Sequence, residues 1–80
     1  MSKISRAQLK QLIEAAIFVA EQPLSQDQMQ LTVLDGLAVS KTMLKDTLAE
    51  LKLDYQTRGI QLVEVASGFR FQSMDSLSPW

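Results

Sequence analysis

The hydrophobic repeat changes once along this chain, at Gly59, and this change restricts the possible folds more than any other feature of the sequence. Before Gly59, apolar residues recur every three or four positions, which is the spacing of amphipathic helices. After Gly59, the chain carries short runs of β-branched and aromatic residues, which are typical of strands. The sequence therefore predicts helices followed by strands. With 80 residues, the chain is limited to one domain.

Three serines mark the expected starts of three helices. Ser5 and Ser25 are each followed three residues later by a glutamine, which is the capping-box pattern, and Ser40 precedes the third helical repeat. The first helix is expected to end before Pro23, and the second at Gly36, since glycine readily adopts the left-handed conformation after a helix. The expected helices span about residues 6–21, 26–35 and 41–56.

The apolar spacing also predicts which face of each helix is buried. In the first helix, we expect a core-facing stripe of Leu9, Leu12, Ile13, Ala16, Val19 and Ala20. In the second helix, Met29 and Val33 form one stripe, and Leu31 and Leu34 extend the apolar surface. In the third helix, the stripe consists of Leu44, Leu48, Leu51 and Tyr55.

The strands that follow form a predicted β-hairpin. Ile60–Val65 is the first strand, Ser67–Gly68 the turn, and Phe69–Gln72 the returning strand. A lone hairpin is marginally stable in water, so we expect Phe69 and Phe71 to anchor it on the helices. Three helices and a two-stranded wing predict a mainly α fold with a small β-hairpin, the winged helix-turn-helix. The domain is expected to span 1–73, with 74–80 beginning a linker to a further domain.

Composition argues against most catalytic chemistry. The chain has no cysteine and no histidine, so it has no thiol or imidazole for metal binding or nucleophilic catalysis. Its three glycines are isolated, and the sequence lacks a phosphate-binding loop. The serines that precede the helices are interpreted as caps. We expect no enzyme activity, cofactor, metal or small-molecule ligand. With no signal-peptide pattern and no long apolar run, we expect a soluble cytoplasmic protein.

DNA binding is an alternative function for a winged helix, in which the third helix enters the major groove. The outer face of that helix would mix cationic, anionic and uncharged residues, namely Thr42, Lys45, Asp46, Ala49, Lys52 and Leu53. Asp46 and Glu50 would repel phosphates, and the wing tip is uncharged ahead of Arg70. The formal net charge is −1. A DNA-binding transcriptional regulator is therefore the second hypothesis.

Some apolar residues face away from the predicted core. Phe18 lies about 180° from Leu9 around the first helix, and Leu53 lies opposite Leu44 on the third. Phe18 has two interpretations: it packs under the hairpin, or another subunit covers it. Leu53 is either a single exposed residue or part of the same kind of interface. The candidate partner-binding residues are Ile4, Phe18, Met29 and Leu53.

An ordered set of residues resembles the segregation and condensation protein B (ScpB) family. Leu12–Ser25, LIEAAIFVAEQPLS, is similar to the I-E-A-L-L-F helix and the E-P-L-S that open that family. The resemblance continues at 48–51, at Tyr55, at 58–60, at 62–72 (LVEVASGFRFQ) and at 77–80 (LSPW). Ser67 and Ser73 depart from it, because the family often has Gly and Thr there. The resemblance covers nearly the whole chain.

The resemblance implies a non-enzymatic, nucleoid-associated subunit of a condensin-like complex that compacts and segregates bacterial chromosomes. In that family, ScpB forms a homodimer largely through its N-terminal winged helix. It also binds the kleisin subunit ScpA, which bridges the heads of an SMC ATPase. Kleisin binding in the family depends strongly on a second winged-helix domain. This chain is therefore expected to keep dimerisation and to lose much of the affinity for the kleisin.

Overall fold

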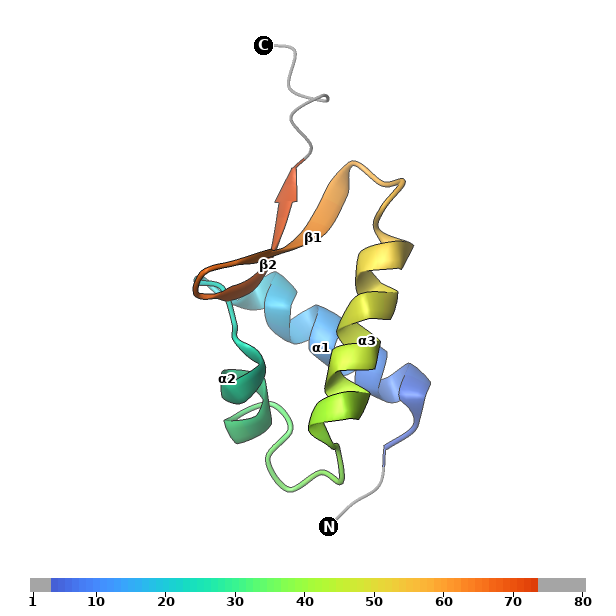
Figure 1. The fold of residues 1–80 in the computed structure, drawn as a ribbon, viewed down its shortest axis with the longest axis vertical. Helices are drawn as coiled ribbons and strands as arrows, with labels where there is room; N and C mark the ends of the chain where they lie inside the picture. The colour runs from blue at the N-terminus through green and yellow to red at the C-terminus, as the bar shows by residue number, and fades with distance from the viewer. Residues whose placement is uncertain (1–3, 74–80) are drawn as a thin grey trace.

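Each of the three helices begins directly after a capping serine, as the sequence predicted. The computed structural model describes residues 4–73, so the expected linker at 74–80 lies outside the described residues. Gln8 and Gln28 donate their backbone N–H groups to the hydroxyls of Ser5 and Ser25, each at 3.1 Å, and their side chains complete both capping boxes. The elements are α1 (Arg6–Val19), α2 (Gln26–Leu31), α3 (Lys41–Asp54), β1 (Ile60–Val65) and β2 (Gly68–Ser73) (Figure 1).

Helix α2 is shorter than the sequence predicted, because it ends at Leu31 rather than at Gly36. The Thr32 hydroxyl donates to the Gln28 carbonyl at 2.6 Å, and the chain then continues as turns. These turns bury Leu34, which is 2% exposed, while Leu31 is left outside the core at 77%. Gly36 has a φ of 82°, so the expected left-handed glycine is present, but it ends the turns rather than the helix.

Helix α1 buries a different edge of its apolar stripe from the one that its spacing suggested. Leu9 and Ile13 lie in the core as expected, and Ile17 joins them. Val19, expected in the core, is 77% exposed. Ile17 and Val19 lie about 80° on opposite sides of Leu9 around the helix axis, so the spacing alone does not choose between them. The helix is rolled toward Ile17.

The hairpin is antiparallel and is attached to the segment that follows α1. β1 and β2 pair in the register Leu62↔Phe71 and Glu64↔Phe69, with Ala66 and Ser67 as the turn. Gly68 therefore begins β2 rather than closing the turn. Its φ is 143°, and a Cβ atom there would stand 2.3 Å from the backbone carbon of Leu24. Only glycine allows Leu24 to approach and form its β-bridge with Phe69.

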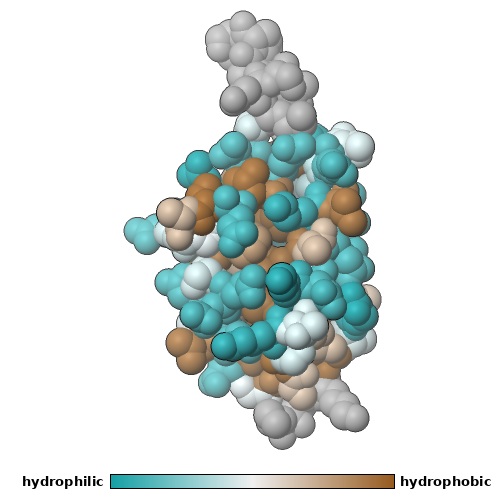
Figure 2. Space-filling view, viewed as in Figure 1, coloured by the Kyte–Doolittle hydropathy of each residue, from teal (hydrophilic) through white to brown (hydrophobic). Residues whose placement is uncertain are grey.

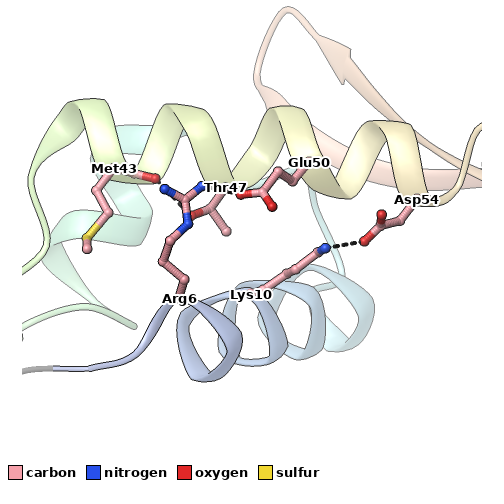
Figure 3. A network of polar contacts seen from close by, with 6 residues as sticks. All are labelled: Arg6, Lys10, Met43, Thr47, Glu50 and Asp54. Carbon is pink, nitrogen blue, oxygen red and sulfur yellow. Dashed lines mark hydrogen bonds and ion pairs between the residues drawn. The ribbon is translucent and has the colours of Figure 1, made fainter.

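The core lies between the three helices and the hairpin, with α1 packed on α3 and β2, and α3 packed on β1 (Figure 1). It consists of Leu9, Ile13, Ile17, Met29, Leu34, Leu44, Leu48, Leu51, Leu62 and Phe69. Ion pairs join α1 to α3 at the surface. Arg6 pairs with Glu50, and Lys10 with Asp54 at 2.5 Å (Figure 3). The predicted fold class, three helices with a two-stranded wing, is confirmed.

Candidate protein-interaction surfaces

The four candidate partner-binding residues lie in four different environments. Phe18 and Leu53 are 67% and 66% exposed, on α1 and α3 respectively. Ile4 is partly buried and lines a shallow hollow beside Leu12 and two glutamines of α1. Met29 is 0% exposed and is the buried residue of α2. Met29 therefore belongs to the core and offers no side-chain surface to a partner in this fold.

The exposed Phe18 belongs to a small apolar surface at the C-terminal end of α1. Its ring lies 6.0 Å from the ring of Phe71, centroid to centroid, and Phe71 lies 4.8 Å from the ring of Tyr55. Ala15 and Val19 continue the surface along α1 and line a hollow with Phe18 and Tyr55. We call this set the Phe18 surface: Ala15, Phe18, Val19, Tyr55 and Phe71. One side of the ring therefore lies against the hairpin, as the packing interpretation expected, and most of the side chain is exposed. That another subunit covers Phe18 stays a prediction.

Sequence reasoning missed Val19 as a surface residue. Together, Phe18 and Val19 place two large, mostly exposed apolar side chains at adjacent positions. A signal was present, because Val19 stands next to Phe18 in the last turn before Pro23. When a helix ends directly after two adjacent apolar residues, few residues of the same helix remain to cover those side chains. Scattered exposed apolar residues are ordinary on a protein surface, but an adjacent pair beside two aromatic rings forms a patch.

Charged groups border the Phe18 surface on the side of α3. The Tyr55 hydroxyl donates a hydrogen bond to the Glu14 carboxylate, and the Arg58 guanidinium lies 4.7 Å from the centre of the Tyr55 ring. The hydrogen bond to Glu14, followed by burial, raises the pKa of the Tyr55 phenol above its ordinary value. The protonated phenol is therefore retained to higher pH than in a free tyrosine.

A second hollow lies between α3 and β1. Ala49, Lys52, Leu53 and Gln56 form its helical wall, and the four successive residues 61–64 form its strand wall. We call it the α3–β1 groove. On the face shown in Figure 2, apolar residues appear as separate patches among hydrophilic ones rather than as one continuous area. The two apolar candidates Phe18 and Leu53 line two different hollows, which share no lining residue.

The charges of α3 are arranged differently from the expectation for its outer face. Glu50 was expected to face outward with Asp46, but it pairs with Arg6 of α1 (Figure 3). Asp54 is held in the same way by Lys10. The residues expected on the outer face, including Lys45 and Lys52, are exposed. Two of the three carboxylates of α3 are thus paired with cations of α1, so its outward face carries less unpaired negative charge than the sequence suggested.

Within residues 4–73, no three acidic side chains gather in a group that could hold a metal ion. In the same part of the chain, every helix is too short and too polar to cross a bilayer.

Comparisons with known proteins agree on one family. A family model described as "Segregation and condensation complex subunit ScpB" matches residues 11–80. A curated relative, "Segregation and condensation protein B homolog" of Coxiella burnetii (strain RSA 493 / Nine Mile phase I), is 42% identical over 77 residues. That match covers 96% of this chain and 37% of the relative, so the chain spans less than half of the relative's length.

Two solved structures share the fold. "Crystal Structure of ScpB from Mycobacterium tuberculosis" superposes with a TM-score of 0.80 at 19% identity, over 95% of this chain and 46% of that one. "Crystal structure of dimer of ScpB N-terminal domain complexed with ScpA peptide" gives a TM-score of 0.75 at 28% identity, over 95% of this chain and 87% of that one. In the second structure, as its name states, the related domain is a dimer and holds a peptide.

Proposed function

The chain belongs to the family of the segregation and condensation complex subunit ScpB, and on this premise we propose that it is a non-catalytic subunit of such a complex. In this proposal, the domain forms a homodimer and binds a ScpA-type kleisin, through which it joins an SMC ATPase at the nucleoid. The family that the sequence resembled is confirmed by the match to residues 11–80. The related N-terminal domain that is dimeric with a ScpA peptide supports the assembly proposed for this chain.

The observation that best supports the proposed dimer is the exposure of the Phe18 surface. Phe18 and Val19 are 67% and 77% exposed, and they stand beside the partly buried rings of Tyr55 and Phe71. Aromatic side chains in such positions commonly supply the central contacts of an interface. We assign this surface to a two-fold contact, in which each copy presents the same residues to the other. The mechanism is burial of apolar area, with no chemical step.

Light scattering on the purified chain, with and without a change of Phe18, tests the dimer. The wild-type chain should show twice its mass of 9.0 kDa at high concentration. Phe18→Asp should raise the dimer dissociation constant by at least about tenfold, because a carboxylate would be buried without a partner. Circular dichroism should show an unchanged helical fold, since the Phe18 side chain is mostly in solvent.

Leu31→Asp is the matched control, because Leu31 is also exposed, at 77%, but lies on α2 outside the Phe18 surface. It should leave the mass unchanged. A wild-type chain that stays monomeric at every concentration would contradict the dimer. If Phe18→Asp and Leu31→Asp weakened the dimer equally, its interface would not be the Phe18 surface. The DNA-binding alternative has less support, because the comparisons point to a complex subunit. Absence of duplex binding at about 50 mM salt would exclude it.

A further inference from the structure

The turn before the segment that leads into α3 carries Asp35 and Gly36 at its two central positions (Figure 1). The Leu37 N–H donates to the Leu34 carbonyl at 3.0 Å and closes the turn around them. Both central residues are exposed. Gly36 has a φ of 82°, and a Cβ atom there would meet nothing within 4 Å. The Asp35 carboxyl and the Gly36 backbone are therefore both open to solvent.

The amide of Gly36 also lacks the hydrogen bond that holds the amide after other aspartates. Within residues 4–73, the Gly36 N–H has no acceptor. The other aspartates of this range lie in helices, and the residue after each one has a hydrogen-bonded amide. These aspartates are Asp27, Asp46 and Asp54. The Gln28 N–H donates to the Ser25 hydroxyl at 3.1 Å, and the Tyr55 N–H donates to the Leu51 carbonyl at 3.1 Å.

A free amide beside an exposed carboxyl allows one reaction within the chain itself. The Gly36 nitrogen can attack the Cγ carbon of the protonated Asp35 carboxyl. The amide proton and the carboxyl OH leave as water, and a succinimide ring forms. Water then adds to one of the two ring carbonyls. Addition at Cγ restores aspartate, whereas addition at the main-chain carbon gives isoaspartate, so the reaction needs no other reagent.

The two residues that follow and precede this pair tie the turn to the core. Leu34 is 2% exposed, and Leu37 packs against the same hydrophobic cluster. In isoaspartate, the main chain passes through Cβ and Cγ, so it is one carbon longer between Leu34 and Leu37. The two leucines then cannot keep both their positions and the hydrogen bond that closes the turn.

We propose that Asp35–Gly36 is a modification site, at which aspartate isomerises spontaneously to isoaspartate and thereby loosens the connection between α2 and α3. Glycine favours the reaction because it has no Cβ atom to obstruct the attacking nitrogen. The hydrogen-bonded amides after the helical aspartates oppose it, because the helix must open before the nitrogen can attack. The proposal does not depend on the proposed function.

Peptide mapping by liquid chromatography and mass spectrometry tests the site. The full chain and two synthetic peptides, of residues 32–40 and 42–50, are incubated together at mildly acidic pH. Asp35 should isomerise in the folded chain within about threefold of its rate in the first peptide, because the turn does not hold the Gly36 amide. Asp46 should isomerise at least about tenfold more slowly than in the second peptide, because α3 holds the amide of Thr47.

Two variants separate the chemistry from the fold. Gly36→Ala should slow the reaction at Asp35 by about tenfold, since a Cβ atom restricts the backbone and obstructs the nitrogen. Asp35→Glu should stop it, because the longer side chain would have to close a larger ring that forms much more slowly. After incubation, the isoaspartyl form isolated from the native chain should melt at a lower temperature than the unmodified chain. Incubated Asp35→Glu should keep its melting temperature.

Each part of the proposal has a result that would overturn it. If Asp35 isomerised at least about tenfold more slowly in the folded chain than in its peptide, the turn would protect it and the site would be wrong. If the isoaspartyl form melted together with the unmodified chain, the modification would not loosen the connection between α2 and α3. Neither result would change the proposed dimer or its partners.

Discussion

The two ends of α1 differ in sequence and in surroundings. At its start, Leu9 and Ile13 are fully buried, and Arg6 and Lys10 pair with Glu50 and Asp54 of α3. Its last turn carries Phe18 and Val19, both mostly exposed. From the first ion pair to the second, the positions move four residues forward on both α1 and α3, so the two helices run in the same direction here. The second pair is at Asp54, the last residue of α3. The last turn of α1 therefore extends past the end of α3, and only the hairpin remains to cover it.

This difference teaches that the exposure of an apolar residue depends on the helix face that carries it: Ile17 is 4% exposed, whereas Phe18, about 180° from Leu9, is 67% exposed. Apolar residues occur along all of α1, yet they are buried only where α3 and the hairpin reach them. The uncovered end is the Phe18 surface. In the proposed dimer, a second copy covers this surface.

Alanine substitutions at the two ends should differ most in stability. Ile13→Ala should lower the free energy of unfolding by about 3 kcal/mol, because it leaves a cavity in the core. Phe18→Ala should cost less than about 1 kcal/mol, since it removes mainly the contact with Phe71. Urea unfolding at low protein concentration measures both values without a contribution from association. Equal losses would contradict the distinction between the two ends.

Substitution of Gly68 should weaken the attachment of the hairpin to the segment that follows α1. Gly68→Ala places a Cβ atom 2.3 Å from the backbone of Leu24, so the Leu24–Phe69 bridge must open or shift. We expect a loss of about 2–3 kcal/mol in the free energy of unfolding. Thermal unfolding followed by circular dichroism measures it.

Gly36→Ala is the matched control for Gly68→Ala. Gly36 also has a positive φ, but its Cβ would meet nothing within 4 Å. It should cost only about 1 kcal/mol, from backbone strain alone. If the two variants melted at the same temperature, the close approach of Leu24 would not be important for stability.

The smallest expected effect on stability concerns Tyr55, which follows the last residue of α3 and donates a hydrogen bond to Glu14 of α1. The hydrogen bond to Glu14 raises the pKa of the Tyr55 phenol. Folding then favours the protonated phenol, so its contribution to stability is complete below about pH 10 and is lost as the pH rises through the raised value. Absorbance at alkaline pH follows the single tyrosine of the chain directly.

Glu14→Gln should lower the Tyr55 pKa toward its ordinary value, because the anionic acceptor is removed. Fold and helix content should stay the same, since Glu14 is only partly buried. An unchanged titration curve in this variant would show that Glu14 does not control the phenol in solution.

Several features of the fold were predictable because they depend on neighbouring residues. The serine caps, the left-handed Gly36 and the strand-forming residues after Gly59 each act within a few positions. The end of α2 was not predictable, because Leu34 leaves the helix to reach the core. Met29 could not be separated from a surface residue, since core and interface positions have the same apolar character.

The sequence by itself determined the order of the elements, the starts of the helices and the family to which the chain belongs. Tertiary structure alone decided which edge of α1 is buried, at Ile17 rather than Val19, and where the carboxylates of α3 point. The reason is physical. Caps and periodicities are local, whereas the roll of a helix and the partner of a charged side chain depend on segments that are distant along the chain.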